Sequence, residues 1–510
     1  MAKKKLKARY DCLATKRNPF LIRAREYAAL TIPSILPPLG HTYTMRLPEP
    51  YQGFGARAVV NLAARLQTAL LPAGQPSFRY RVPGALLLKG GKMSPPVEVE
   101  RGLALSEELT CSEIENKGWR QLTSLTLQLL IVTGNALEQM MPDNTIRVFR
   151  LDQYVVCRDH AGNLVEVIME EKLSPSALPD YAKAYVDPKK LQDSNGDSEV
   201  ELYTCYERQT DGSYKTWQEL DGTTIPQSRG KYRDQAQLNI WAIRWAAVPC
   251  ESYGRGKVEE HVADLRTLEN YTKSLIDGAA MASRHITLVR PNAAGGNLRQ
   301  RIAKANNGDV IGANKDDVHM LTFDNVAGLQ IVQAAIDKLL PQLSGAFLMV
   351  GDMRRDAERV TAYELRLLAE ELETGLGGVY SLLASEMQKR RIARVTYQMQ
   401  KQQKLPQWPD GMIDAQITTG LEALGRQEEV RKVMTAADIV KNLPGSEEYA
   451  KFGDLLQIAF TGIGLANAVR TDKEVADRQH QQAMSTAVAG GIGQTVGAAG
   501  QAALAPPPQQ

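Results

Sequence analysis

The sequence predicts an α+β chain that is mainly helical, because two stretches with helical periodicity flank one stretch with the period of β-strands. Residues 10–140 are mainly helical in pattern and are broken by two segments rich in proline and glycine. From Thr145 to Leu220 the apolar residues alternate, and from Gly256 the helical pattern returns. A chain of 510 residues is longer than one hydrophobic core usually serves, so we expect about three domains or one large assembly subunit.

Residues 51–72, YQGFGARAVVNLAARLQTALLP, begin like a dinucleotide-binding fingerprint, with Gly53-x-Gly55. That fingerprint needs a buried strand before it and an acidic residue about 20 positions later. Here the preceding RLPEPYQ holds two prolines and the matching region PAGQPSF holds no acid. We therefore predict a packing helix with Gly53 and Gly55 as a flexible entry. Its expected buried stripe comprises Val59, Leu62, Ala63, Leu66, Ala69 and Leu70.

The composition limits the kind of function. Lys and Arg number 61 against 58 Asp and Glu, so the net charge of +3 is too small for a protein that coats nucleic acid, and any DNA contact should be local. The five cysteines are odd in number and far apart, which argues against a disulfide framework. The basic N-terminus lacks the apolar region of a secretion signal. The longest uncharged run, Gln121 to Leu137, is too polar to span a bilayer and predicts a buried helix.

Two short patterns imitate metal sites and are interpreted as loops. Cys157-x-x-His160 has no second half-site nearby, so a turn is the better interpretation. Asp193, Asn195 and Asp197 are spaced like calcium ligands, but Ser198 and Thr204 stand where the glycine and the closing glutamate are needed. The sequence thus predicts neither a metal site nor a cofactor site.

The central stretch predicts two β-hairpins of a mixed sheet. TIRVFRLDQYVVCRDHAGNLVEVIMEEKL alternates on both sides of the turn DHAGN, and VELYTCYERQTDGSYKTWQEL repeats the form around residues 210–213. Farther along, Val258, Val262, Leu265, Leu268, Leu275 and Ile276 form one helical stripe. His261 beside Asp264 resembles a catalytic pair, but a solvated or interfacial helix face explains the spacing better.

A small insert separates this helix from a second one. Residues 286–313 have β-like ends and a turn at Asn306-Asn307-Gly308, and a helix is expected from about Val326 to Leu343. Next comes a basic segment bracketed by glycines, SGAFLMVGDMRRDAERVTA, and then a long helix from Ala362 to about Met399, loosened at its glycines. Residues from about 479 to 510 carry no charge and are rich in Ala, Gly and Gln, which is typical of a tail without a core of its own.

The search for catalytic motifs gives one alternative function. The sequence has no phosphate-binding loop, nucleophile elbow or zinc-protease helix. Asp143, Glu170 and Lys172 imitate a metal-dependent nuclease, in which two carboxylates hold Mg²⁺ and a lysine orients the attacking water. In a chain with 119 charged residues such a short pattern arises by chance, and a solvated strand end is the preferred interpretation.

A series of strings in order gives the strongest indication of function. These are TIPSILP near Tyr27, GARAVVNLAARLQTALLP, VTGNAL, YVVCRDHAGN, ESYGRGKVEEHVADLRTLEN, ERVTAYELRLLAEELETGLGGVYSLL and ITTGLEALGR. Together they resemble the head-to-tail connector, or portal, family of short-tailed bacteriophages. The resemblance runs from about Tyr27 to Arg426 and fades at both ends of the chain.

The resemblance implies a non-enzymatic ring of twelve subunits, set in the virion at one vertex of the capsid and assembled in the host cytoplasm. Double-stranded DNA would pass through the ring without sequence specificity during packaging and ejection. The implied protein partners are the major capsid and scaffolding proteins, the terminase packaging motor, and the tail adaptor and internal core proteins; no membrane is implied. The implied segments are a wing (1–255), a first stem helix (256–281), a clip (282–325), a second stem helix (326–343), a channel loop (344–361), a long wing helix and return (362–428), a helical crown (429–480) and a low-complexity tail (481–510).

Within this architecture the basic segment before the long helix is the candidate DNA contact. We expect rings of arginines to touch phosphates at the narrowest point, because one arginine per subunit becomes many around a ring. An equally good interpretation pairs these arginines with Asp352, Asp356 and Glu358 between neighbouring subunits. The candidate residues are Arg354, Arg355, Arg359 and Arg366.

Overall fold

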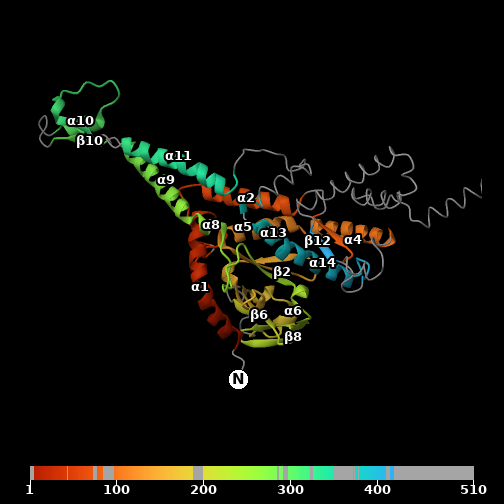
Figure 1. Cartoon of the computed structure of the whole chain (residues 1–510). Helices are drawn as coiled ribbons and strands as arrows, with labels where there is room; N and C mark the ends of the chain where they lie inside the picture. Colours follow the sequence, from red (N-terminus) through yellow and green to blue (C-terminus); the bar gives the residue numbers. More distant parts are fainter. Residues whose placement is uncertain are drawn as a thin grey trace, which may run out of the picture. The chain divides into compact units, whose positions relative to one another are not determined.

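The computed structural model describes residues 5–42, 44–72, 77–83, 97–187, 199–283, 286–290, 297–321, 326–349, 372, 374–376, 378–408 and 414–417. The chain divides into two compact units. The larger comprises Met1–Leu70, Lys117–Arg359 and Glu371–Arg394, and the smaller comprises Leu71–Asn116, Val360–Glu370 and Val395–Gln510. Helices and strands are both abundant in the described chain, which confirms the predicted α+β class (Figure 1).

The described helices of the larger unit follow the predicted helical stretches. They are α1 (Leu6–Leu30), α2 (Phe54–Leu70), α5 (Trp119–Thr133), α6 (Asp180–Lys183), α8 (Lys257–Glu260), α9 (Val262–Ala282), α10 (Leu298–Lys304), α11 (Val326–Ala346), α13 (Val379–Leu383), the π-helical turn η7 (Ala384–Gln388) and the start of α14 (Lys389–Lys401). Short 3₁₀ turns lie at Leu151–Gln153, Pro175–Ala177, Gln235–Gln237 and Lys315–Asp317.

The described strands of the larger unit form three sheets. A five-stranded sheet has the order β4 (Tyr154–Arg158), β5 (Leu164–Leu173), β6 (Val200–Arg208), β7 (Tyr214–Leu220) and β8 (Thr223–Tyr232). A three-stranded sheet has the order β3 (Ile146–Phe149), β2 (Asn135–Met140) and β9 (Ile240–Arg244), and a separate pair joins β10 (Ile286–Val289) to β11 (Val318–Leu321).

Both predicted hairpins are confirmed, but the prediction of a mixed sheet is wrong for the described strands. β4 pairs with β5 across the turn DHAGN, and β6 pairs with β7 across residues 209–213. Every described strand pair is antiparallel. Short links force the β4–β5, β6–β7 and β7–β8 pairs to be antiparallel, because a parallel pair needs a long crossover connection. The β5–β6 pair is also antiparallel, although residues 174–199 form a long link between its strands.

Helix α1 covers one face of the five-stranded sheet. Its Leu6, Tyr10 and Leu13 form a buried cluster with residues of β4, β5 and β6, among them Ile168 and Cys205. Polar contacts fix the same arrangement, because Arg9 Nε donates to Glu166 at 2.9 Å. A second buried cluster joins Leu178, Ala182 and Val186 of the α6 region to residues at the start of β6, the end of β7 and β8. The sheet therefore has two covered faces in this region.

Helix α2 confirms the packing interpretation of residues 51–72, with one correction. All six residues of the expected stripe are buried. Gly55, however, is not a flexible entry. It lies inside the helix, and a Cβ placed there would come 2.5 Å from the carbonyl oxygen of Leu30. A glycine is needed here because two backbones approach closely.

A buried ion pair ties three elements of the larger unit together. The guanidinium of Arg391 on α14 forms an ion pair with the carboxylate of Glu138 on β2, in which Arg391 Nε donates to Glu138 Oε2 at 2.7 Å. Arg391 Nη1 also donates to Thr123 Oγ1 at 2.8 Å, and the hydroxyl of Thr126 donates to Glu138. Arg391 and Glu138 are 2% and 0% exposed, so each charge depends on the other for compensation.

The described part of the smaller unit contains one strand pair and helix α4 beside it. β1 (Phe78–Arg81) pairs with β12 (Asp414–Ile417), and α4 (Val97–Asn116) lies against β1. The Tyr80 hydroxyl shares hydrogen bonds with Thr110 at 3.1 Å and with Thr396, in the second half of α14, at 2.6 Å. The strand β1 falls in a stretch where the sequence pattern is mainly helical, and its partner lies more than 300 residues later, so short-range periodicity does not reveal it.

The stability of the smaller unit should depend on pH through Glu107. The carboxylate of Glu107 accepts a hydrogen bond from the Tyr80 amide at 2.8 Å, and burial raises the pKa of this carboxyl to about 7. The folded state therefore binds the extra proton, and its stability is highest below pH ~4.5 and falls by up to about 3 kcal/mol as pH rises through 7. Urea unfolding between pH 5 and 8 should show this loss. Glu107→Gln should flatten it and the exposed neighbour Glu108→Gln should not; equal slopes in all three proteins would contradict the assignment.

All five cysteines are free in the structure. Among the described residues, no helix is long and apolar enough to cross a membrane. The predicted buried helix in the uncharged run is confirmed as α5, although it ends at Thr133 and the chain continues into β2.

Candidate functional site: a helical hairpin and its insert

The four arginines expected to contact DNA, Arg354, Arg355, Arg359 and Arg366, lie outside the described residues, and so does most of the basic segment that holds them. The described chain leads to this segment through α11. Phe347, just after that helix, is fully buried, and its ring centroid lies 5.5 Å from that of His261 at the start of α9. This contact holds the C-terminal end of α11 against the N-terminal end of α9.

Two backbone segments meet where the chain enters α8 and α9. Gly134 ends α5 with φ +74°, and Gly254 and Gly256 lie against it. Asn135 joins the segments, because its side-chain amide donates to the carbonyl oxygen of Gly254 at 3.0 Å and its side-chain oxygen accepts from the Gly254 amide at 2.7 Å. This glycine contact forms the base from which α8 and α9 extend.

Charged side chains surround the same base. Arg255 donates to Glu251 at 2.8 Å and to Glu259 at 2.5 Å, and these carboxylates raise the pKa of the Arg255 guanidinium. Arg23 of α1 reaches Glu259 at 3.2 Å. The ion pairs therefore link α1, the loop before α8, and α8 itself.

Helices α9 and α11 form an antiparallel hairpin, and Figure 1 shows them side by side. Both expected helices are present, although α11 continues to Ala346. The expected stripe on the first helix is only partly buried: Val258, Leu265 and Leu268 are covered, but Ile276 is 46% exposed. On α11, Ile331 is 72% exposed. The outer part of the hairpin thus presents apolar side chains that this chain does not cover.

Gly278 sets the distance between the two helices. A Cβ placed there would lie 2.5 Å from Cδ2 of Leu329 on α11. We expect Gly278→Val to destabilise the hairpin by about 1–3 kcal/mol, because added volume in a packed contact displaces its neighbour. Adding Leu329→Ala to Gly278→Val should recover part of the lost stability. The control Gly345→Ala on α11 should cost little stability, because a Cβ there meets nothing within 4 Å. Denaturant unfolding measures all four proteins; a Gly278→Val variant as stable as the Gly345→Ala control would contradict the close packing.

The insert joins the end of α9 to the start of α11. β10 and β11 pair with Ile286 opposite Leu321 and Val289 opposite Val318, and α10 lies between them in the sequence. The expected first strand and the turn are confirmed: the Asp309 amide donates to the carbonyl oxygen of Asn306 at 3.1 Å. The second strand lies at Val318–Leu321, beyond the expected insert end at residue 313, because residues 309–314 have no regular secondary structure and a 3₁₀ turn follows them.

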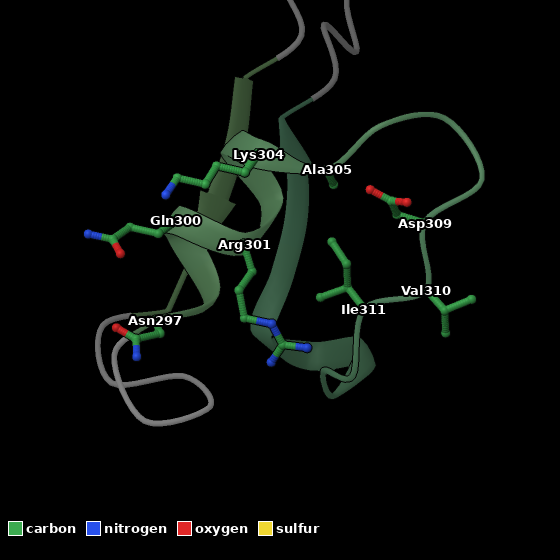
Figure 2. Close-up of a pocket in the computed structure, with 8 residues that line it drawn as sticks. All are labelled: Asn297, Gln300, Arg301, Lys304, Ala305, Asp309, Val310 and Ile311. Atoms are coloured by element: carbon green, nitrogen blue, oxygen red, sulfur yellow. The ribbon is translucent and has the colours of Figure 1, made fainter.

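A surface hollow of about 480 Å³ lies between α10 and the following loop. Figure 2 shows Arg301 of α10 on the side that faces Ile311, whereas Gln300 and Lys304 point away from it. Val310, in the loop, is 98% exposed. Leu288 of β10 is also 50% exposed. The described part of the insert therefore presents basic and apolar side chains to solvent, a combination suited to a protein contact rather than to catalysis.

His261 and Asp264 do not form a catalytic pair. Nδ1 of His261 lies 4.0 Å from the Asp264 carboxylate, beyond hydrogen-bonding distance. Burial, and next the charge of Lys257, lower the pKa of His261. The imidazole packs on Phe347, so its role is structural.

The residues of the nuclease alternative do not come together. Asp143 lies in the β2–β3 turn, is 59% exposed and accepts from Thr145 Oγ1 at 2.7 Å. Glu170 and Lys172 alternate with Glu171 on β5, and Glu170 accepts from the Tyr203 hydroxyl at 3.0 Å on the face that α1 covers. Strand β3 follows Asp143 in the sequence, and its Arg147 forms an ion pair with Glu171 of β5. The side chain of Glu171 lies on the opposite face of β5 from that of Glu170. Asp143 thus approaches the wrong side of β5 for a shared metal ion.

The sequence analysis missed one buried arginine and one group of three arginines. Arg391 pairs with Glu138 from 253 residues away, and Arg158, Arg244 and Arg390 gather beside the β4–β5 turn. The sequence contains one indication for Arg244, because this arginine follows the apolar run IWAI. In the structure the strand is buried at every position, where an arginine is unusual. The sequence around each arginine gives no indication of a partner that lies far away in the chain.

Comparison with known proteins identifies the family. The profile of a family described as bacteriophage head to tail connecting protein matches residues 3–468. The portal protein of Escherichia phage T7 is 31% identical over 492 residues, covering 94% of this chain and 90% of that protein. The portal protein of Enterobacteria phage T3 is 31% identical over 504 residues, covering 96% and 93%. That of Enterobacteria phage SP6 is 29% identical over 438 residues, covering 84% and 81%. The chain belongs to the family of bacteriophage head to tail connecting proteins.

Proposed function

We propose that twelve copies of this chain form a ring with an axial channel, through which double-stranded DNA enters the capsid and later leaves it. As a member of the connector family, the chain is a portal protein of the virion at the capsid vertex, where head and tail join. The observation that carries the proposal is the match to portal relatives over nearly the whole of both chains. The proposed role is mechanical, and no enzymatic step belongs to it.

The proposed segments assign a task to each part of the chain. Residues 1–255 form the wing, 256–281 and 326–343 the two stem helices, and 282–325 the clip. The uncovered apolar side chains of α9 and α11 support a stem that packs against the neighbouring copy. The exposed clip residues suit contacts with the packaging motor and then with the tail adaptor, and residues 429–480 form a crown toward the capsid interior, near scaffolding and core proteins.

The proposed DNA contact is made by the segment after α11. Residues 344–361 form the channel loop, and Arg354, Arg355, Arg359 and Arg366 contribute rings of positive charge at the narrowest point. The buried anchor of Phe347 on His261 supports a loop that begins from a fixed position. Contacts to phosphate position a duplex without reading its sequence, as a channel requires.

Arginine replacement in the channel tests this proposal. In the double variant Arg359→Ala with Arg366→Ala we expect DNA retained in filled heads to fall by on the order of tenfold, because two phosphate contacts per subunit are lost. Nuclease-protected DNA per particle measures it, and Arg229→Ala, on an exposed part of β8, is the matched control. Intact rings with unchanged packaging and retention would contradict the gripping role and favour ion pairs between subunits.

A further inference from the structure

Four arginines from four elements gather beside the β4–β5 turn of the larger unit. They come from β4, β6, β9 and α14, and the carboxylates near them come from the turn and from η7. The arginines are Arg158, Arg208, Arg244 and Arg390, and the carboxylates are Asp159 and Glu386. Nothing in the proposed channel function uses this cluster.

Arg244 is the unusual member of the cluster. It ends β9, is 8% exposed, and its Nε is buried without a hydrogen-bond partner among the described residues. No ion pair to Arg244 is present in the described chain either. The Nε–H group of Arg244 has therefore lost water without gaining an acceptor, which is costly for a buried donor.

Arg158 lies close to Arg244, and backbone carbonyl oxygens accept three of its hydrogen bonds, which leaves further N–H groups for another acceptor. Its three nitrogens donate to the carbonyl oxygens of Ser252 at 3.1 Å, Gly162 at 2.9 Å and Ala242 at 2.7 Å. These acceptors carry no net charge, so Arg158 keeps its positive charge uncompensated. Burial, and next the charge of Arg244, lower the pKa of Arg158 to about 10.

Gly162 brings the two guanidinium groups to one place. Its carbonyl oxygen accepts from Arg158, and a Cβ placed on it would lie 3.4 Å from Nη2 of Arg244. The glycine at residue 162 therefore lets the turn pass close to the guanidinium of Arg244. The guanidinium groups of Arg158 and Arg244 therefore both approach the β4–β5 turn at Gly162.

The cluster has a surplus of positive charge. Arg208 is neutralised by Asp159 at 3.1 Å, and Asp159 is further engaged by the amides of Ala161 and Asn163. Glu386 influences Arg158 through its charge, but it makes no ion pair within the described chain. Arg244, Arg390 and one carboxylate, Glu386, thus all lie close enough to Arg158 for their charges to affect it. Three positive charges and one negative charge leave a surplus that equals the charge of one dianion.

We propose that Arg244, together with Arg390 and Arg158, binds an oxyanion of the phosphate type beside Gly162. A doubly charged tetrahedral anion fits the surplus better than a single carboxylate, and the planar donors of arginine suit its oxygens. The anion is either free inorganic phosphate, which carries the two charges, or two neighbouring phosphates of the nucleic-acid backbone, which carry one charge each. The proposal does not depend on ring formation or on the channel arginines.

Thermal unfolding of the full-length chain in phosphate tests the site. Sodium phosphate replaces sodium chloride at constant ionic strength and constant pH, and the apparent Kd follows from the rise in Tm with phosphate concentration. Phosphate also stabilises proteins non-specifically by exclusion from their surfaces, so the variants decide the result. Arg244→Met and Arg390→Gln remove site donors, and Arg229→Ala removes an exposed arginine elsewhere.

We expect the wild-type chain and Arg229→Ala to show a saturable rise in Tm, and both site variants to need at least about tenfold more phosphate for the same rise. In chloride alone, Arg244→Met should be more stable than the wild type, because a buried uncompensated charge has been removed. A parallel titration with a short DNA duplex distinguishes the sources: loss of duplex binding in Arg244→Met, with no saturable effect of free phosphate, assigns the site to nucleic acid. Equal responses of all four proteins to both anions would overturn the proposal.

Discussion

Replacing Arg391 with alanine is expected to lower the free energy of unfolding of the larger unit by about 3–5 kcal/mol. The substitution leaves the carboxylate of Glu138 fully buried with the hydroxyl of Thr126 as its remaining donor. It also removes the contact to Thr123 and the stacking of the guanidinium over the Trp119 ring at 6.0 Å. Because the pair joins α14 to β2 and α5, its loss should weaken the core between them.

Denaturant unfolding of single chains measures this effect, with Lys401→Ala on the exposed face of the same helix as the control. The double variant Glu138→Leu with Arg391→Met should recover most of the loss, because apolar residues of similar volume commonly replace a buried ion pair without cost. If Arg391→Ala were as stable as the control, the pair would not contribute as described.

Replacing Gly134 with alanine should also be strongly destabilising, by at least about 3 kcal/mol. The residue has φ +74°, and its new Cβ would lie 2.6 Å from the carbonyl carbon of Arg255 and from the amide nitrogen of Gly256. Backbone atoms cannot move aside as a flexible side chain can. The base of the α8–α9 connection would have to open.

Gly118 provides a matched control at the other end of α5. Its φ is +65°, but a Cβ there meets nothing within 4 Å. Gly118→Ala should therefore cost about 1–2 kcal/mol for the left-handed conformation alone. The difference in Tm between the two variants isolates the steric contact, and equal losses would show that the close approach of the Gly254–Gly256 backbone is not a constraint.

Local periodicity predicted the elements whose pattern is complete within one segment. The stripe of α2, both β-hairpins, and helices α9 and α11 were predicted because the periodic pattern of each helix or hairpin is complete within its own segment. The β1–β12 pair and the Arg391–Glu138 contact were not, since their partners are separated by more than 250 residues. Gly55 was misread because only the fold shows that the backbone at Leu30 approaches it.

The functional assignment came from ordered strings rather than from chemistry. No single motif in this chain carries a reaction, so the residues could exclude functions more readily than assign one. The string ESYGRGKVEEH was informative because its glycines and Arg255 form the base of the hairpin. The expected channel arginines lie outside the described residues, and their role stays a prediction.

Counting the subunits of the purified protein tests the central claim most directly. Negative-stain electron microscopy with native mass measurement should show rings of about twelve copies of the 56.2 kDa chain around a central hole. A monomer or a small dimer under all assembly conditions would contradict the proposed channel.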